Sequence, residues 1–304
     1  MNAALDALAT ELYVVIDDLL VDNPHLAPDR PAVGIAPQLT DAELVTLAVL
    51  QALLGHHNEA RFIRYAHAHL RGLFPYLPQR PAYNKRLRRS VALLQAALAL
   101  LARRCQGWHD DLWLIDSTPV ECGRSRETAK RSNLAGTAGY GYCASHSRFF
   151  WGLRLHLIAT PDGLPITYAL TNPKHDERVV ARDLLETNPD LLADRPGQTI
   201  MADKGYRSTE LEAILASHGA TLIRPSFKNE KPRPGQRFLR PFRQIIESIN
   251  QTLKAGLDLE RHAARSLPGV AARVLQRLLA LTAVIWHNEH HDAPTLRSLT
   301  THDH

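Results

Sequence analysis

Residues 151–170, WGLRLHLIATPDGLPITYAL, contain the clearest strand pattern in the chain. Apolar residues alternate with other residues from Trp151 to Ala159, and a second apolar run follows the turn sequence Pro161-Asp-Gly163. Alternation at a period of two predicts a strand with one buried face, and an Asp-Gly pair between two such runs favours a hairpin. We therefore predict an antiparallel hairpin over these residues.

Further strands and helices are predicted on both sides of this hairpin. Short apolar runs predict strands at 111–116, 198–203 and 220–224, and helices are predicted at 176–185, from residue 208, and at 241–254. The stretch 119–148 is rich in Gly, Ser and Arg and is predicted to be a loop. The order β-β-β-α-β-α-β-α predicts an α/β fold with a mixed sheet of the ribonuclease H kind.

The first hundred residues predict a helical region. Apolar residues at intervals of three and four mark one helix face: Leu5, Leu8, Leu12, Val15, Ile16 and Leu19. Thr40-Asp-Ala-Glu43 predicts a capping box, Gly55 the end of that helix, and Asn58 the N-cap of a third. A fourth helix is predicted from about Tyr83 through the apolar run that follows.

We predict two domains, a helical DNA-binding region at 1–107 and an α/β domain with a C-terminal helix at 108–304. The 304 residues are 45% hydrophobic and 22% charged, which excludes a disordered chain. No basic region precedes the apolar residues at the start, so no secretory signal is predicted, and the apolar run 91–102 is too short to span a membrane. Three cysteines without close spacing are typical of a reducing cytosol.

The small net charge of +5 conceals a sharp segregation. Residues 1–60 carry nine acids and one base, residues 61–104 carry ten bases and no acid, and residues 224–243 carry seven bases and one acid. Such a distribution attracts polyanions and favours a nucleic-acid partner. Alternatively, the basic face neutralises the acidic N-terminal helices. In the first interpretation, DNA meets the basic part of the fourth helix, which carries Lys85, Arg86, Arg88 and Arg89.

Three acids are the candidate catalytic residues. Asp116 and Asp203 each follow an apolar run that predicts a strand, and strand ends are where ligands gather in open α/β sheets. Burying unpaired acids is costly, and a hard divalent cation is their natural partner. Glu247, on the helix predicted at 241–254, is placed to supply the third carboxylate. Oxygen ligands favour Mg²⁺, with Mn²⁺ as a substitute.

Two bases share the predicted face of that helix with Glu247. Offsets of four and eleven residues from Arg243 place Glu247 and Lys254 within roughly 40° of it on a regular helix. A metal-ligating carboxylate between two cations suits a phosphodiester strand, with the bases on its phosphates.

Several of these motifs together resemble the insertion-sequence transposases with a DDE triad, most closely the group called IS nine-eight-two. The matching segments, in the order of that family, are Ile115-Asp116-Ser-Thr-Pro-Val, Gly141-Tyr-Cys-Ala-Ser, Trp151-Gly-Leu-Arg-Leu-His, His175-Asp176, Asp203-Lys-Gly-Tyr206, Arg243-x3-Glu247-x6-Lys254, His262-Ala-Ala-Arg265 and Trp286-His-Asn288. The resemblance spans residues 5–288. It implies a ribonuclease H-like catalytic core in a bacterial, cytoplasmic protein that acts on double-stranded DNA, as a homodimer.

The resemblance also implies a mechanism. Asp116 would bridge two metal ions, with Asp203 on one and Glu247 on the other. The enzyme would bind the terminal inverted repeats, cut the element's ends with water, and join the 3′-hydroxyls to target DNA. Related transposases often carry a tyrosine three residues before the arginine that corresponds to Arg243, and this chain has Arg240 at that position. The difference concerns the handling of DNA ends more than catalysis. Phe242 is a candidate to supply the missing aromatic ring.

Some interpretations stay open. Two other functions are a nuclease that never joins strands and a catalytically silent DNA-binding regulator. Lys204 either contacts DNA or belongs to a turn that Gly205 shapes. The aromatic residues of 140–151 either stack on unpaired bases or cover the sheet edge, and we favour the edge. The histidines near the C-terminus (His287, His290, His291, His302 and His304) are predicted to form a polar tail and no zinc site.

Overall fold

The computed structural model describes residues 3–29, 36–143, 147–193, 195–231, 233, 235 and 239–300. The chain forms two compact units. The sheet unit comprises Gln106–Thr252, and the helical unit combines Met1–Cys105 with Leu253–His304. The expected two-domain division at residue 107 grouped the C-terminal helix with the sheet, whereas the structure groups it with the N-terminal helices.

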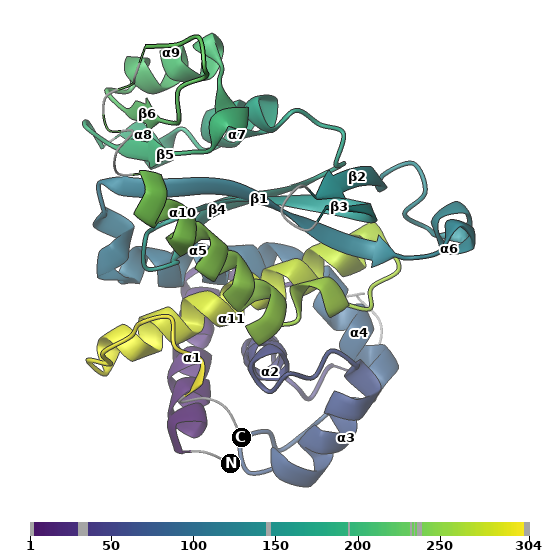
Figure 1. Cartoon of the computed structure of the whole chain (residues 1–304). Helices are drawn as coiled ribbons and strands as arrows, with labels where there is room; N and C mark the ends of the chain where they lie inside the picture. The colour runs from purple at the N-terminus through teal and green to yellow at the C-terminus, as the bar shows by residue number, and fades with distance from the viewer. Residues whose placement is uncertain are drawn as a thin grey trace. The chain divides into compact units, whose positions relative to one another are not determined.

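The sheet unit contains six strands in one mixed sheet. The strands are β1 (Leu112–Gly123), β2 (Gly139–Cys143), β3 (Arg148–Ala159), β4 (Pro165–Thr171), β5 (Thr199–Met201) and β6 (Thr221–Ile223). The order is β2-β3-β1-β5-β6, and β4 pairs with the second half of β3 (Figure 1). β1, β3 and β4 are antiparallel, while β5 and β6 run parallel to β1. This is the predicted ribonuclease H-like arrangement, with β2 as an additional strand.

Helices connect and flank these strands. They are the 3₁₀-helix η2 (Gln106–His109), α6 (Arg126–Arg131), α7 (Glu177–Thr187), α8 (Asp190–Ala193), the 3₁₀-helix η4 (Lys204–Tyr206), α9 (Thr209–Ser217) and α10 (Leu239–Gln251). α7 packs against β3 and β4, and α10 packs against β1. The β3–β4 hairpin turns at Gly163, whose φ of +88° is the reason for glycine there.

Two expectations about the sheet unit are wrong. The first strand does not end at Asp116 but continues to Gly123, because β3 pairs with it along this whole length. The predicted loop at 119–148 contains the end of β1, α6 and β2. The glycine content of this stretch was misleading, because Gly139 and Gly141 lie within the paired strand β2, where a Cβ would clash with neighbouring atoms.

The helix carrying Glu247 also departs from expectation. Regular α10 ends at Gln251, and a π-helical turn, η6 (Thr252–Gly256), follows. A π turn changes the number of residues per turn, so the regular 3.6-residue spacing that aligned Lys254 with Arg243 does not hold. The Lys254 amine lies 3.8 Å from Glu260 instead.

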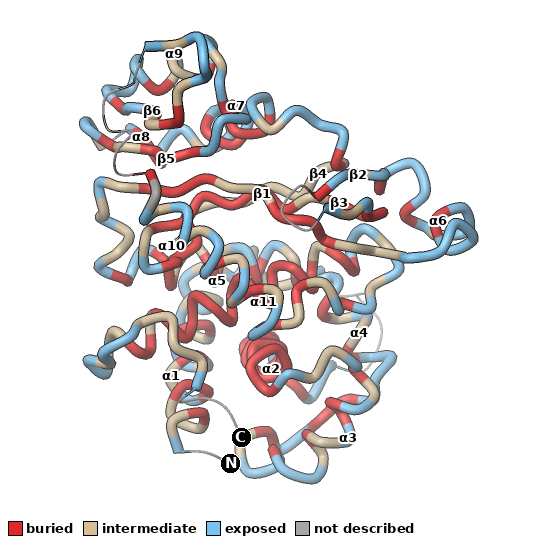
Figure 2. The backbone as a smooth tube through the Cα atoms, viewed as in Figure 1, coloured by how far each residue is buried: buried red, intermediate tan, exposed pale blue. Residues whose placement is uncertain are grey.

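The helical unit is built from both ends of the chain. Its helices are α1 (Ala3–Asp22), η1 (Pro24–Leu26), α2 (Asp41–Leu53), α3 (Glu59–His69), α4 (Arg80–Arg89), α5 (Val91–Arg104), η7 (Leu259–Arg261) and α11 (Leu267–His290). The capping box at Thr40, the αL glycine at Gly55 and the Asn58 cap are all confirmed. Figure 2 shows α2 buried along almost its entire length, as its burial pattern records.

The expected fourth helix is two helices. α4 ends at Arg89, and Ser90 donates its hydroxyl to the Arg86 carbonyl at 3.0 Å before α5 begins. A side chain that competes for a backbone carbonyl in this way favours a break. The basic residues and the apolar run therefore belong to different helices.

Helix α11 is the core of the helical unit. It packs against α2, α4 and α5. By length and composition it could cross a membrane, but 89% of its most apolar 18-residue stretch is buried, which is typical of a core helix.

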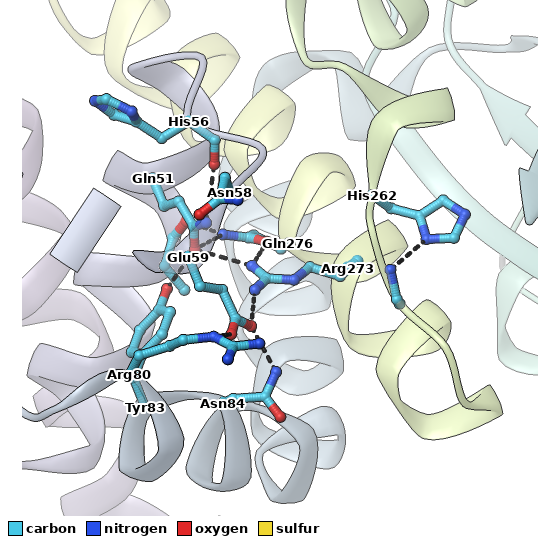
Figure 3. Close-up of polar contacts among 12 residues, drawn as sticks. Gln51, His56, Asn58, Glu59, Arg80, Tyr83, Asn84, His262, Arg273 and Gln276 are labelled. Carbon is cyan, nitrogen blue, oxygen red and sulfur yellow. Dashed lines mark hydrogen bonds and ion pairs between the residues drawn. The ribbon is translucent and has the colours of Figure 1, made fainter. Parts of the chain in front are cut away.

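A buried polar network joins α11 to the N-terminal helices (Figure 3). The Arg273 guanidinium donates to Gln51 Oε1 at 2.9 Å and to Gln276 Oε1 at 2.7 Å, and it forms an ion pair with Glu59. The Tyr83 hydroxyl donates to the same Gln51 oxygen at 2.8 Å. Each buried charge thus has a partner, which its desolvation requires.

Replacing one member of the ion pair should destabilise the helical unit. Arg273→Met removes the buried guanidinium that pairs with Glu59 and leaves the exposed Arg80, 3.5 Å away, as a cation beside that carboxylate. We therefore expect the free energy of unfolding to fall by about 3 kcal/mol. Urea unfolding followed by circular dichroism measures the change. The double variant Glu59→Gln/Arg273→Met should recover part of the loss, because no charge is then left unpaired; a double variant no more stable than the single would refute this explanation.

Candidate active site

Asp116 lies where β1 leaves its parallel neighbour. β5 pairs with β1 only from Leu112 to Leu114, while β3 continues alongside and places Leu157 opposite Asp116. Because β5 ends at Met201, its chain turns away next to Asp116, and Asp203 follows two residues later. The two parallel strands therefore deliver both predicted aspartates to the same edge of the sheet.

Asp203 shapes the turn that follows β5. Its carboxylate accepts the backbone N–H of Gly205 at 2.6 Å and caps the 3₁₀-helix η4. A Cβ on Gly205 would lie 2.9 Å from Asp203 Oδ1 and 3.1 Å from Glu177 Oε2, so a larger residue here would push the two carboxylates out of their present positions. The sequence Asp203-Lys-Gly-Tyr206 thus forms a tight turn, and the exposed Lys204 remains available for a DNA contact.

A further carboxylate, which sequence reasoning missed, belongs to this cluster. Glu177 is the first residue of α7, which Asp176 caps by accepting the N–H of Arg178 at 2.9 Å. Its Oε1 accepts a hydrogen bond from Ser117 at 2.6 Å and forms an ion pair with Arg154 at 2.5 Å. The only sequence indication was an acid directly after the matched pair His175-Asp176.

The crowding of carboxylates alters their protonation. Burial raises the pKa of Asp116 to about 6, against the hydrogen bonds from Ser117 and Asn250 that favour the charged form. Burial also raises the pKa of Asp203, an effect that Glu177 reinforces and that Arg243 opposes. Nearby acids without enough cations to balance them are typical of functional sites.

Helix α10 approaches the two aspartates with the face that carries Glu247. The Asn250 amide donates to Asp116 Oδ2 at 2.7 Å, and the charge of Arg243 lowers the pKa of Asp203. Glu247 lies between Arg243 and Asn250 in the sequence, within roughly 60° of both around the helix axis. Its side chain is exposed and makes no hydrogen bond or ion pair with the residues that the structure describes.

The predicted DNA-binding bases differ in their surroundings. Lys85, Arg88, Arg89 and Arg243 are exposed. Arg86 is occupied within the helical unit, where it donates to the Leu39 carbonyl at 2.7 Å and to Asp41 at 2.6 Å. The side chain of Arg240 lies outside the described residues.

Aromatic side chains project from β2 and the start of β3. Tyr140, Tyr142 and Phe149 are 52%, 47% and 77% exposed, and the rings of Tyr142 and Phe149 lie 5.0 Å apart. Phe150 and Trp151, from the same stretch, are buried in the sheet as expected. The exposed rings of the other three residues are also available to stack on unpaired bases, so both interpretations stay open.

The site fits a divalent cation. All candidate ligands are carboxylate oxygens, the donors that Mg²⁺ and Mn²⁺ prefer. The Tyr206 hydroxyl is buried beside Asp116, Asp203 and Glu177 and finds no hydrogen-bond partner among the described residues. Two acids with raised pKa values beside an unsatisfied hydroxyl indicate a pocket whose polar groups need a further partner.

The raised pKa of Asp116 gives a testable pH dependence. A carboxyl group whose folded pKa is above its unfolded value stabilises the fold at low pH, and this contribution is lost as pH rises from about 4 through about 6. Asp116→Asn imitates the protonated acid. Without divalent metal, we expect it to raise the free energy of unfolding at pH 8 by on the order of 2 kcal/mol, and hardly at all at pH 4.

Urea titrations at the two pH values measure this difference. Asp162→Asn, in the exposed β3–β4 turn, is the matched control and should show a much smaller gain. Equal gains for the two variants at pH 8 would show that Asp116 is not destabilised by its surroundings.

Comparisons with known proteins identify the family of the chain. No match is found among curated proteins. Among solved structures, a piggyBac transposase synaptic complex with hairpin DNA, determined by cryo-EM, is similar at 9% sequence identity and a TM-score of 0.42, over 95% of this chain and 80% of that one. The family model for the transposase DDE domain matches residues 107–283. That match covers more than half of the chain, and the protein therefore belongs to the DDE transposase family of enzymes.

Proposed function

We propose that this DNA transposase mobilises an insertion sequence, of the IS nine-eight-two kind, by cutting its ends and joining their 3′-hydroxyls to target DNA. The observation that carries the proposal is the convergence of Asp116 and Asp203 at one sheet edge, with the Arg243–Asn250 face of α10 beside them. The proposal includes a bacterial, cytoplasmic enzyme that acts as a homodimer on the two ends.

In this proposal Asp116, Asp203 and Glu247 would hold two Mg²⁺ ions. Bound Mg²⁺ activates the attacking oxygen and stabilises the leaving oxygen of a phosphodiester, and Mn²⁺ can substitute. Asn250 orients the Asp116 carboxylate through its 2.7 Å hydrogen bond. Ser117 follows Asp116 in β1. Glu177, whose charge is neutralised by Arg154, orients the Ser117 side chain by accepting its hydrogen bond.

The basic residues hold the DNA strand. Arg243 is exposed on the same helix as Glu247, so a phosphate bound there lies one helical turn from the carboxylate. Lys204 follows Asp203 directly and offers a second phosphate contact. Lys85, Arg88 and Arg89 present a basic surface on α4 for the terminal inverted repeats. Lys254 and Arg240 are separate candidates for further phosphate contacts.

The reaction products distinguish this function from its alternatives. The purified protein is incubated with a labelled transposon end, target DNA and Mg²⁺. Joined product supports transposition, hydrolysis without joining supports a nuclease, and retention without cutting supports a regulator. An intact set of three acids argues against the regulator, because a silent protein has no need to retain them.

Substitution of the two glutamates identifies the third metal ligand. Glu247→Gln should lower the rate of end cleavage on the order of 1,000-fold, because a ligand to the ions is lost. Glu177→Gln should lower the rate only about 10- to 100-fold, because it disturbs the orientation of neighbouring groups. Single-turnover cleavage measures both rates. The reverse order of the two effects would assign the third position to Glu177.

The salt dependence of DNA binding tests the basic surfaces. Each phosphate contact contributes about 0.9 to the slope of log affinity against log salt. The variant Lys85→Gln/Arg88→Gln/Arg89→Gln should therefore reduce the slope by about 3. Arg243→Gln/Lys254→Gln should reduce it by about 1 to 2, because Lys254 must leave Glu260 to reach a phosphate.

Fluorescence anisotropy with a labelled end measures these slopes. Lys130→Gln/Arg131→Gln is the control, because these exposed bases of α6 pair with Glu127 and lie outside both surfaces. Slopes that do not change in either test variant would exclude these residues as phosphate contacts.

A further inference from the structure

Three potential metal ligands meet in the helical unit, far from the carboxylates of the sheet unit in sequence. Glu11 comes from the middle of α1, His287 from the last turn of α11, and His291 is the C-cap residue directly after that helix. Glu11 Oε2 lies 2.9 Å from His287 Nδ1, and Glu11 Oε1 lies 2.9 Å from His291 Nε2. One atom of each residue lies within 4.8 Å of the other two.

The helix backbone fixes the two histidines on one face. The N–H of His291 donates to the His287 carbonyl at 3.1 Å, so the four-residue spacing of an α-helix continues through His291. This spacing brings side chains i and i+4 side by side, and the two rings lie 4.3 Å apart. Asn288 anchors the following segment by donating to the carbonyls of Leu296 and Ser298.

The surroundings differ among the three ligands. The His287 side chain is 6% exposed, that of Glu11 is 31% exposed and that of His291 is 49% exposed. The cluster is therefore buried at His287 and accessible to water at His291. A cation at this position also lies at the C-terminus of α11, where the helix dipole is negative.

We propose that Glu11, His287 and His291 bind one Zn²⁺ ion, with water as the fourth ligand, and so join α1 to the end of α11. Two nitrogen donors and one carboxylate favour Zn²⁺ over Mg²⁺, which prefers oxygen alone. Ligand atoms at 2.0–2.2 Å from a tetrahedral zinc are about 3.4 Å apart, so the observed spacing needs only small movements. The ion replaces the ring protons that now face the carboxylate.

Zinc binding to the full chain tests the site. The protein carries Asp116→Asn and Asp203→Asn, so that the catalytic carboxylates do not compete, and is stripped with a chelator before titration with zinc chloride. We expect one tightly bound Zn²⁺ per chain and a Tm that rises with zinc concentration. Co²⁺ in place of Zn²⁺ should give the visible absorption of a four- or five-coordinate site.

Matched variants separate this site from the other histidines. His291→Ala and Glu11→Gln should each weaken zinc binding at least 10-fold and abolish the zinc-dependent rise in Tm. His290→Ala should retain both, because the His290 ring stacks 6.3 Å from Trp286 and is not a ligand. His302→Ala/His304→Ala, outside the described residues, should retain them too.

Two results would overturn the proposal. Zinc binding of equal affinity in the parent protein and in the His291→Ala variant would show that zinc binds elsewhere. A parent protein with no rise in Tm on zinc addition would show that Glu11 and the histidines form hydrogen bonds only. Circular dichroism of each metal-free variant establishes that it is folded before either result is interpreted.

Discussion

Desolvation of the Asp116 and Asp203 carboxylates, reinforced by repulsion from Glu177, is the constraint on which the site depends. Desolvation and mutual repulsion raise the pKa values of both aspartates, so the folded chain is less stable at neutral pH than it would be with neutral groups there. The sheet compensates for this cost by backbone pairing: β3 holds β1 on both sides of Asp116. A site that is unfavourable without a cation is also one that binds a cation strongly, since binding removes the repulsion.

The groups around the aspartates differ in how they affect the charge of the site. Arg154 forms an ion pair with Glu177, and Ser117 donates a hydrogen bond to it. The two aspartates are therefore the acids with the greatest need of a cation. Asn250 supplies a neutral donor to Asp116, and a neutral donor orients a carboxylate without cancelling the charge that a metal ion requires. Arg243 contributes a cation from the exposed face of α10, where a DNA phosphate can also reach it.

Local patterns predicted much of this arrangement, and long-range register decided the rest. The β3–β4 hairpin, the Thr40 capping box and both aspartates follow from apolar periodicity and turn chemistry within a few residues. The continuation of β1 past Asp116 does not, because it depends on pairing with β3. Glu177 was missed for the same reason: its partners Ser117 and Arg154 lie 60 and 23 residues away. The acid that meets His287 is 276 residues away, so the C-terminal histidines looked like a polar tail.

The chain order of the two units has a consequence for folding. The sheet unit is inserted between the two halves of the helical unit. Gln51 in α2 and Glu59, the first residue of α3, are buried, and the guanidinium that pairs with them belongs to Arg273, more than 200 residues later. Buried polar groups without partners are costly, so the N-terminal helices cannot reach their native packing until α11 has been synthesised. The sheet unit is contiguous and has no such requirement, so the catalytic fold can form before the helical unit is complete.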